Sequence, residues 1–530
     1  MHGHRPLVSS LRGMVAAAHP LAAFAGARIL RSGGNAFDAA VATVAALNVV
    51  EPFMSGLAGL GMATCFHAES RKVRCLDFCP GAPEGLDVAG LGKQDIFAGP
   101  RASAVPGNLA GWARLAGDMG TLPLSELLLP AIELAREGFP VTDGIATVTP
   151  QWWDLRARDA EWVRVYTDGS GELKPGWILK QPDLAATLES IAVDGPAVLY
   201  GGALGEAMVK HLAAGGGALA MSDLEAMQAH WVEPLEVPYR GLSVHSMPPP
   251  AEAFQFLLTL GILEAVDLAA FERDGVEHLD AVFRAVRLAA EARIERNRTS
   301  HQEIAALLDG EGVAALRAHH AAGQGVEGRT QQWGSITDPA LIGMREYTTS
   351  LSAADDEGNM VCITQSLGSI YGSGVVIPGT GVCMNNFLNW SDLDPASPNH
   401  LQAGQRTAMC LAPSISTRVG KPVLALGTPG SYGILHTQVQ AMVQYLDFGL
   451  PLQQAIEAPR ARLWDGRRIT LESRIAPQVV ERLNQRGHEV SLTDAWTLKV
   501  GGMQAVERDP LSGVLTGAAD PRRDGYAAAP

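Results

Sequence analysis

The first part of the chain is dominated by apolar residues at helical spacing. Residues 20–50 predict two helices, because Gly33-Gly34 interrupts the pattern and Pro52 ends it. The same periodicity predicts further helices at 124–138, 181–192, 203–217 and 278–296. The apolar side chains of the last helix form one stripe, which indicates a core-facing surface and no binding site: Leu279, Val282, Phe283 and Val286.

Strand patterns appear at residues 59–67 and 72–78 and become dense from Tyr347 onward. Residues 348–366 predict a hairpin, because its turn at 355–359 has a turn composition that includes a glycine. Further strands are expected at 381–390 and 421–433, followed by helices at 436–449 and 451–459. This order of strands and helices predicts an α+β fold in which two sheets lie between layers of helices.

The composition is that of a globular protein with a small-molecule ligand. Of the 530 residues, 47% are hydrophobic and 18% are charged, which excludes the disordered class. A nucleic-acid partner would require a basic face, whereas the net charge is −15. We therefore expect no nucleic acid as a partner.

The cysteines indicate a reducing compartment or no preference for one, and the N-terminal segment predicts a cytoplasmic protein. The six cysteines form no C-x-x-C pair and no zinc-ligand spacing, so we interpret them as small core residues: Cys65, Cys75, Cys79, Cys362, Cys383 and Cys410. The N-terminal segment lacks the apolar region of a signal peptide. The longest apolar run, residues 39–50, is shorter than the roughly 20 residues that span a bilayer, so no membrane span is expected.

Several potential site motifs have simpler explanations. Asp355 and Asp356 belong to the predicted turn, and the histidine pairs at 2/4 and 319/320 lack a metal-binding context. We expect no metal and no cofactor. The pair Thr348-Thr349 opens a strand and is the remaining candidate nucleophile, although threonine also favours strands for steric reasons alone.

Six segments in collinear order resemble the γ-glutamyltransferase family of N-terminal nucleophile hydrolases. They are residues 13–42, 103–112, 129–141, 239–250, 348–386 and 517–525, the last containing an Asp-Pro-Arg signature. The resemblance implies a four-layer αββα sandwich. It also implies a precursor that cuts itself between Tyr347 and Thr348, so that residues 1–347 and 348–530 stay together as a heterodimer and form one domain.

The resemblance assigns roles around this bond. The Thr348 hydroxyl would attack the Tyr347 carbonyl, and the α-amine that cleavage frees would then serve as the base of the mature enzyme. Ser366 stands where the family has a second threonine that hydrogen-bonds the nucleophile. Gly430 and Ser431 stand at the turn whose N–H groups form the oxyanion hole, with Ser431 in place of a glycine.

The substrate-binding positions depart from the family pattern. Cys79, Met409 and Cys410 replace the arginine and two serines that hold the glutamyl carboxylate. Gly368, Phe387 and Trp390 replace the groups that hold the glutamyl amine. A buried carboxylate without such partners is costly, so these residues predict an apolar acyl group on a small-molecule amide substrate. Alternatively, they only repack the core while Arg406 takes over the carboxylate.

Four functions follow from these observations. The first is an autoprocessing amidohydrolase or acylase for a non-glutamyl amide. The second is a genuine γ-glutamyltransferase or glutathione hydrolase with a rearranged pocket, and the third is an unprocessed scaffold or binding protein. The fourth, a secreted peptide-capsule transferase, is disfavoured by the missing export signal. The sequence leaves open whether the heterodimer forms a higher oligomer.

Overall fold

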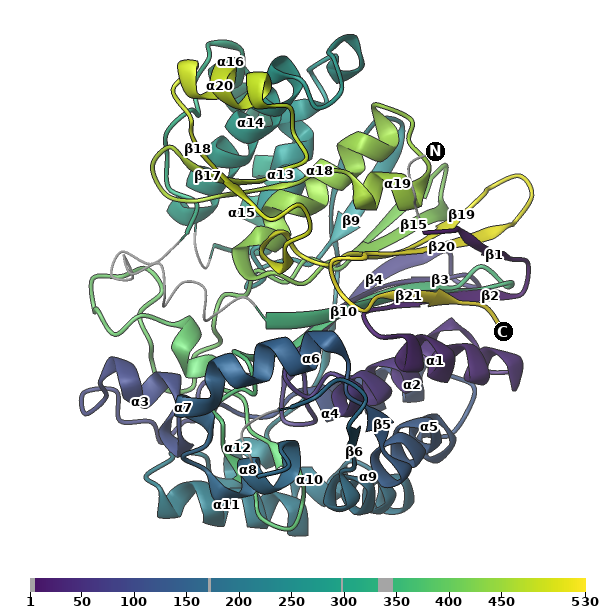
Figure 1. Ribbon diagram of the computed structural model, residues 1–530, viewed down its shortest axis with the longest axis vertical. Helices are drawn as coiled ribbons and strands as arrows, with labels where there is room; N and C mark the ends of the chain where they lie inside the picture. Colours follow the sequence, from purple (N-terminus) through teal and green to yellow (C-terminus); the bar gives the residue numbers. More distant parts are fainter. Residues whose placement is uncertain (1–4, 170–172, 297–298, 332–346) are drawn as a thin grey trace.

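Two antiparallel sheets are stacked face to face between layers of helices in the computed structural model, which describes residues 5–169, 173–296, 299–331 and 347–530 (Figure 1). The α+β prediction and its four-layer αββα form are confirmed. The lower sheet of Figure 1 has the order β21-β2-β10-β11-β3-β4-β7, and the upper sheet has the order β1-β20-β19-β15-β14-β9-β8.

The strands of both sheets are three to nine residues long, and the central pair β10 and β11 is the longest. The lower sheet consists of β21 (Tyr526–Ala528), β2 (Gly13–Ala17), β10 (Tyr347–Asp355), β11 (Met360–Gly368), β3 (Leu60–His67), β4 (Lys72–Asp77) and β7 (His230–Val232). The upper sheet consists of β1 (Val8–Ser10), β20 (Leu515–Ala519), β19 (Gln504–Arg508), β15 (Lys421–Gly427), β14 (Ser414–Arg418), β9 (Leu242–Ser246) and β8 (Leu235–Tyr239). Alternate side chains of the two sheets meet in an apolar layer that includes Met14, Met360, Cys362 and Val506.

Helices cover the outer face of each sheet (Figure 1). Those beneath the lower sheet are α1 (Pro20–Arg31), α2 (Ala36–Val50), α5 (Leu124–Glu137) and α9 (Pro182–Asp194), and those above the upper sheet are α13 (Phe254–Leu263), α14 (Val276–Glu295), α18 (Ile434–Leu446) and α19 (Leu452–Glu457). Helix α2 is apolar on all sides and buried throughout, and a capping box between Asn35 and Asp38 fixes its start.

The remaining elements surround these layers. The helices are α3 (Lys93–Phe97), α4 (Asn108–Met119), α6 (Asp143–Val148), α7 (Trp153–Arg156), α8 (Ala160–Tyr166), α10 (Ala197–Tyr200), α11 (Ala203–Ala214), α12 (Met221–Glu225), α15 (His301–Leu308), α16 (Gly310–Ala321) and α20 (Pro477–Gln485). The strands are β5 (Phe139–Pro140), β6 (Ile178–Leu179), β12 (Val376–Ile377), β13 (Val382–Cys383), β16 (Ala461–Leu463), β17 (Arg468–Glu472) and β18 (Glu489–Thr493). Among the described residues, no helix combines the length and apolarity needed to cross a membrane.

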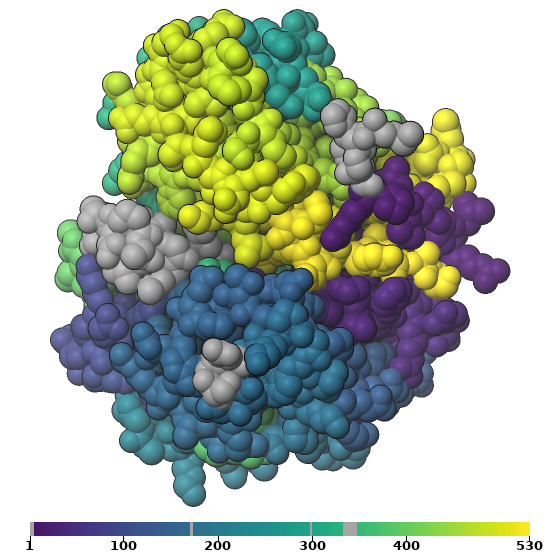
Figure 2. All heavy atoms as spheres, viewed as in Figure 1, coloured from purple at the N-terminus to yellow at the C-terminus, as the bar shows by residue number. Residues whose placement is uncertain are grey.

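Segments from the two ends of the chain are interleaved in both sheets. β2 pairs with β21 on one side and with β10 on the other, β3 pairs with β11, and β1 pairs with β20. The purple N-terminal and yellow C-terminal segments accordingly touch on one face of the molecule (Figure 2). The division into residues 1–347 and 348–530 stays a prediction, but each part supplies strands to both sheets.

The predicted elements agree with the structure except in two regions. The helices and the hairpin β10–β11 are confirmed, whereas the strand expected at 421–433 is confirmed only over Lys421–Gly427, because Ser431–Gly433 form a 3-10 turn, η5. The strand predicted over residues 381–390 is wrong, because only Val382–Cys383 form a strand and Phe387–Trp390 form a 3-10 turn, η4. The reason lies in Asn385 and Asn386, whose side-chain amides donate to backbone carbonyls outside any sheet and so direct the chain into a turn.

Candidate active site

Thr348 lies at an irregularity in the pairing of the two central strands. Tyr347 pairs with Gly368 and Thr349 pairs with Gln365, so Thr348 opposes two residues of β11. This is a β-bulge, a feature that often occurs beside active sites. Thr348 is only 2% exposed, and strand alternation places its side chain on the face that looks toward the upper sheet.

Ser366 hydrogen-bonds the carbonyl group of the predicted cleavage site. Its hydroxyl donates to the Tyr347 carbonyl oxygen at 2.7 Å and accepts from the Gly368 N–H at 2.9 Å. Gly368 has a φ of +102°, and a side chain there would collide with Asn386, so glycine is required at this position. The hydroxyl therefore polarises the carbonyl that a nucleophile would attack during self-cleavage.

The turn that carries Gly430 and Ser431 follows β15 in the upper sheet. The last residue of β15, Gly427, packs directly against Ser350 of β10, which brings this turn toward the start of β10. Ser431 has a φ of +56°, a left-handed conformation that costs an ordinary residue about 1–2 kcal/mol. The Gly430 carbonyl accepts a hydrogen bond from Arg462 at 3.1 Å. The roles of Gly430 and Ser431 as oxyanion donors stay predictions.

Two buried charges contact the same segment from the opposite face. The Thr349 hydroxyl donates to the Glu51 carboxylate at 2.6 Å, and the Arg523 guanidinium donates to the Thr348 carbonyl oxygen at 3.0 Å. Burial raises the pKa of Glu51 to about 7, although the positive charge of Arg523 and the Thr349 hydrogen bond act in the opposite direction. Both side chains lie at the edge of a cavity of about 280 Å³.

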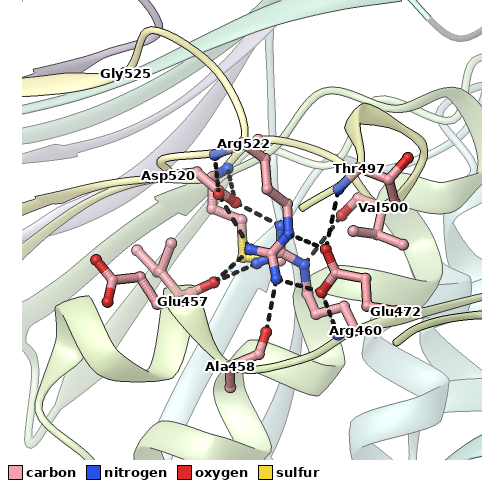
Figure 3. A network of polar contacts seen from close by, with 12 residues as sticks. Glu457, Ala458, Arg460, Glu472, Thr497, Val500, Asp520, Arg522 and Gly525 are labelled. Atoms are coloured by element: carbon pink, nitrogen blue, oxygen red, sulfur yellow. Dashed lines mark hydrogen bonds and ion pairs between the residues drawn. The ribbon is translucent and has the colours of Figure 1, made fainter. Parts of the chain in front are cut away.

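The Asp-Pro-Arg signature explains how Arg523 is held. Its aspartate, Asp520, pairs with Arg460 at 2.5 Å, and its arginine, Arg522, makes two hydrogen bonds of 2.6 and 2.7 Å to Glu472 (Figure 3). All four side chains are at most 1% exposed. This network fixes the loop that carries Arg523 against the head of β10.

The candidate substrate-binding residues are buried in the core. Five of them belong to a single hydrophobic cluster and are at most 4% exposed: Cys79, Phe387, Trp390, Met409 and Cys410. The sixth, Gly368, is the partner of Tyr347 in the hairpin. Burial raises the pKa of the Cys79 and Cys410 thiols, which keeps them protonated and poorly nucleophilic.

Two of the candidate substrate-binding residues are linked to the proposed catalytic groups, one through the lower sheet and one through the turn that carries Gly430 and Ser431. The Cys79 thiol contacts the carbonyl of Gly61, and Gly61 pairs with Gln365 on β11. The ring of Trp390 lies 6.2 Å from that of Tyr432, which directly follows Ser431. The structure therefore brings the predicted site residues to one end of the two sheets, while their roles stay predictions.

Arg406 lies beside Cys79 and already has partners. It donates to the Cys79 carbonyl at 3.0 Å and forms an ion pair with Asp77. Its side chain is 40% exposed. The alternative in which Arg406 binds a substrate carboxylate thus requires it to share its charge with Asp77.

Sequence reasoning missed a buried ion pair behind Met409 and Cys410. Arg293, which is fully buried, pairs with Glu252 at 2.6 Å and lies over the ring of Tyr432, 4.4 Å from its centroid. The Glu252 N–H also donates to the Met409 carbonyl at 2.7 Å. A lone glutamate two positions after Pro250 was the available sequence signal, but the partner arginine is 41 positions away.

Glu51 and Arg523 were also missed as parts of the site. Glu51 is the carboxylate that ends the apolar stretch of α2, and Arg523 lies in the Asp-Pro-Arg segment. Across the described ranges, no group of three or more histidine, cysteine, aspartate or glutamate side chains is arranged to hold a metal ion.

A four-layer αββα sandwich with a threonine at the head of an inner strand defines the architecture of N-terminal nucleophile hydrolases. The family described as Gamma-glutamyltranspeptidase matches residues 22–530, and the chain belongs to this family. The predicted resemblance is thereby confirmed.

Individual relatives cover nearly the whole chain. The Acylase ACY 1 proenzyme of Pseudomonas sp. (strain V22) is 36% identical over 97% of this chain and 93% of its own length. The Glutathione hydrolase-like YwrD proenzyme of Bacillus subtilis (strain 168) is 32% identical over 98% of this chain and 99% of its own length. The crystal structure of cephalosporin acylase from Bacillus halodurans has a TM-score of 0.88 and 31% identity, covering 100% of this chain and 98% of that chain. These relatives support the prediction of an enzyme that acts on amide bonds.

Proposed function

We propose that this protein is a self-cleaving acylase that hydrolyses the amide bond of a small molecule through an ester on Thr348. The observation that carries the proposal is the hydrogen bond of 2.7 Å from Ser366 to the Tyr347 carbonyl. It lies at the β-bulge where Thr348 opposes two residues of β11. A hydroxyl group that polarises this carbonyl prepares the bond for attack by the neighbouring threonine.

Self-cleavage proceeds in two balanced steps. The Thr348 oxygen attacks the Tyr347 carbonyl carbon, the C–N bond breaks, and the proton of the hydroxyl moves to the departing nitrogen. Water then hydrolyses the resulting ester, which leaves a carboxylate on Tyr347 and a free α-amine on Thr348. The two parts would remain a heterodimer, because strands from both parts are hydrogen-bonded side by side in each sheet.

The same groups then act on the substrate. The α-amine of Thr348 takes the hydroxyl proton as the oxygen attacks the substrate carbonyl, and it returns the proton to the leaving amine. The N–H groups of Gly430 and Ser431 stabilise the oxyanion, each being worth on the order of a hundredfold or more in rate. Water completes the cycle by releasing the acid.

The acyl group is expected to be uncharged and apolar. Cys79, Phe387, Trp390, Met409 and Cys410 share one hydrophobic cluster. Burying a carboxylate there without a dedicated cation would cost several kcal/mol. The acylases among the relatives support this choice over a glutamyl substrate. We further propose a cytoplasmic location.

Two experiments test the proposal. Mass spectrometry of the purified protein should give two fragments divided at Tyr347/Thr348, and Thr348→Ala should give only the intact chain without hydrolytic activity. An intact, inactive wild-type protein after prolonged incubation would favour the unprocessed scaffold instead.

The second experiment compares kcat/KM for p-nitroanilides of hydrophobic acids with that for γ-glutamyl-p-nitroanilide. We expect the hydrophobic acyl groups to be preferred by tenfold or more. Cys79→Arg alone should not restore glutamyl activity, because Phe387 and Trp390 would still face the ammonium group. If the wild type prefers the γ-glutamyl compound, the glutathione hydrolase alternative replaces the proposal.

A further inference from the structure

The cavity on the helix side of Thr348 contains charges that the proposed reaction does not use. It has a volume of about 280 Å³, and its charged lining comes from three parts of the fold: Glu51, Asp143, Arg522, Arg523 and Asp524. Arg522 is neutralised by Glu472 and Asp520, and Asp143 is exposed. The charges that remain close to the cleavage site are Glu51, Arg523 and Asp524.

Arg523 is tied to Thr348 by one nitrogen. Nη1 donates to the Thr348 carbonyl oxygen, while Nε and Nη2 are buried and have no hydrogen-bond partner among the described residues. The side chain is 7% exposed, and Glu51, Asp520, Asp524 and the Tyr347 phenol are the groups that interact with its charge. Arg523 therefore places a weakly solvated positive charge at the residue that cleavage converts into an N-terminus.

Glu51 supplies the opposing charge from the end of α2. Glu51 is 4% exposed, and its carboxylate accepts a hydrogen bond from the Thr349 hydroxyl, one residue from the new N-terminus. Arg523 favours its ionised form and Asp524 disfavours it. The segment that carries the Thr348 nitrogen thus contacts a cation and a carboxylate, whose charges act on that nitrogen in opposite directions.

We propose that Arg523 and Glu51 are positioning residues that set the charge state of the Thr348 α-amine in the mature enzyme. This inference rests on the proposed function, in which that amine is the catalytic base. A base must be unprotonated to accept the hydroxyl proton, so a nearby cation helps catalysis at neutral pH and a nearby anion opposes it.

The geometry sets the size of the effect. The nitrogen and carbonyl oxygen of one residue are at most about 3.7 Å apart, so Nη1 of Arg523, at 3.0 Å from the oxygen, lies within about 7 Å of the Thr348 nitrogen. A unit charge at this distance, with an effective dielectric constant of about 20, changes a pKa by on the order of 1.5 units.

The test measures the amine directly and also through activity. The matured proteins are labelled with acetic anhydride across pH 5–10, and the extent of N-terminal acetylation of the Thr348 fragment is read by mass spectrometry. The kcat/KM of a hydrophobic p-nitroanilide is recorded over the same range. Arg523→Gln should move both profiles to higher pH by on the order of 1.5 units, and Glu51→Gln should move both to lower pH.

Matched variants separate this role from a structural one. Arg523→Lys keeps the cation and should restore the wild-type profile, and Asp143→Asn removes an exposed charge from the same cavity and should shift the profiles by less than about 0.3 units. Shifts in the same direction for Arg523→Gln and Glu51→Gln, or no shift for either, would overturn the inference.

Failure of the inference is distinguishable from failure of the proposed function. If wild-type protein is never cleaved, no Thr348 amine exists and both fall. If it is cleaved and active but the profiles do not shift as stated, only the inference falls. If Arg523→Gln does not mature, Glu51→Gln and Asp524→Asn decide, since both remove an anion and must shift the profiles to lower pH.

Discussion

Removing the Ser366 hydroxyl should slow self-cleavage strongly and also lower the stability of the fold. In Ser366→Ala the Tyr347 carbonyl loses the donor at 2.7 Å, and that oxygen carries the negative charge when Thr348 attacks. Loss of one oxyanion donor typically reduces a rate 10²–10³-fold, or about 2.7–4 kcal/mol of transition-state stabilisation. The Gly368 N–H also loses its acceptor, which costs about 1–3 kcal/mol of folding free energy.

The assay follows the intact chain over time. Protein is purified rapidly in the cold, warmed, and sampled for denaturing gels and intact mass, while thermal unfolding of the same samples reports stability. Ser366→Thr keeps the hydroxyl and should cleave within about tenfold of the wild type. Ser350→Ala is the matched control, since Ser350 is as buried as Ser366 but donates to the Ile363 carbonyl at 3.0 Å and not to the Tyr347 carbonyl.

The reasoning predicts a separation between these two variants. Both should unfold at lower temperature, but only Ser366→Ala should accumulate the uncut precursor. Cleavage of Ser366→Ala within threefold of the wild-type rate would refute the role of this hydrogen bond. Equal slowing in Ser350→Ala would show that loss of stability, and not loss of the donor, controls the rate.

Two further predictions concern stability. Glu252→Gln should lower the free energy of unfolding by about 3–5 kcal/mol, because it leaves the fully buried charge of Arg293 without its partner. Glu133→Gln, in an exposed ion pair with Arg28, should lower it by less than about 1 kcal/mol. Similar losses for the two variants in urea unfolding would contradict this prediction. Burial alone would raise the pKa of Asp520, but the charges of Arg460 and Arg522 outweigh burial and lower the pKa to about 2. The ionised Asp520 therefore stabilises the fold by about 2 kcal/mol above about pH 4, and this stabilisation is lost as the pH falls toward 2. Urea unfolding between pH 2 and 6 should show the free energy of unfolding of the wild type falling as the pH is lowered, and a smaller fall in Asp520→Asn.

The sequence predicted the elements whose signals are local. The break between α1 and α2 follows from Gly33-Gly34, and the end of α2 follows from Pro52, because breakers act within a few residues. The position of Thr348 came from a family resemblance. By contrast, Arg523 reaches Thr348 across 175 positions, and no periodicity or spacing encodes such a contact. The strand prediction for residues 381–390 was wrong for a related reason, since the Asn385 side chain hydrogen-bonds the carbonyl of residue 58, which is distant in sequence.

The interleaved sheets have a consequence for biosynthesis. β10 lies between β2, made long before it, and β11, while the arginine that grips Thr348 is translated 175 positions later. A nascent chain that has just produced Thr348 thus lacks Arg523, the Gly430–Ser431 turn and most strands of the upper sheet. The order of synthesis therefore delays completion of the cleavage site, because its environment is complete only when the whole sandwich has assembled. We therefore expect self-cleavage to follow the synthesis and folding of the whole chain.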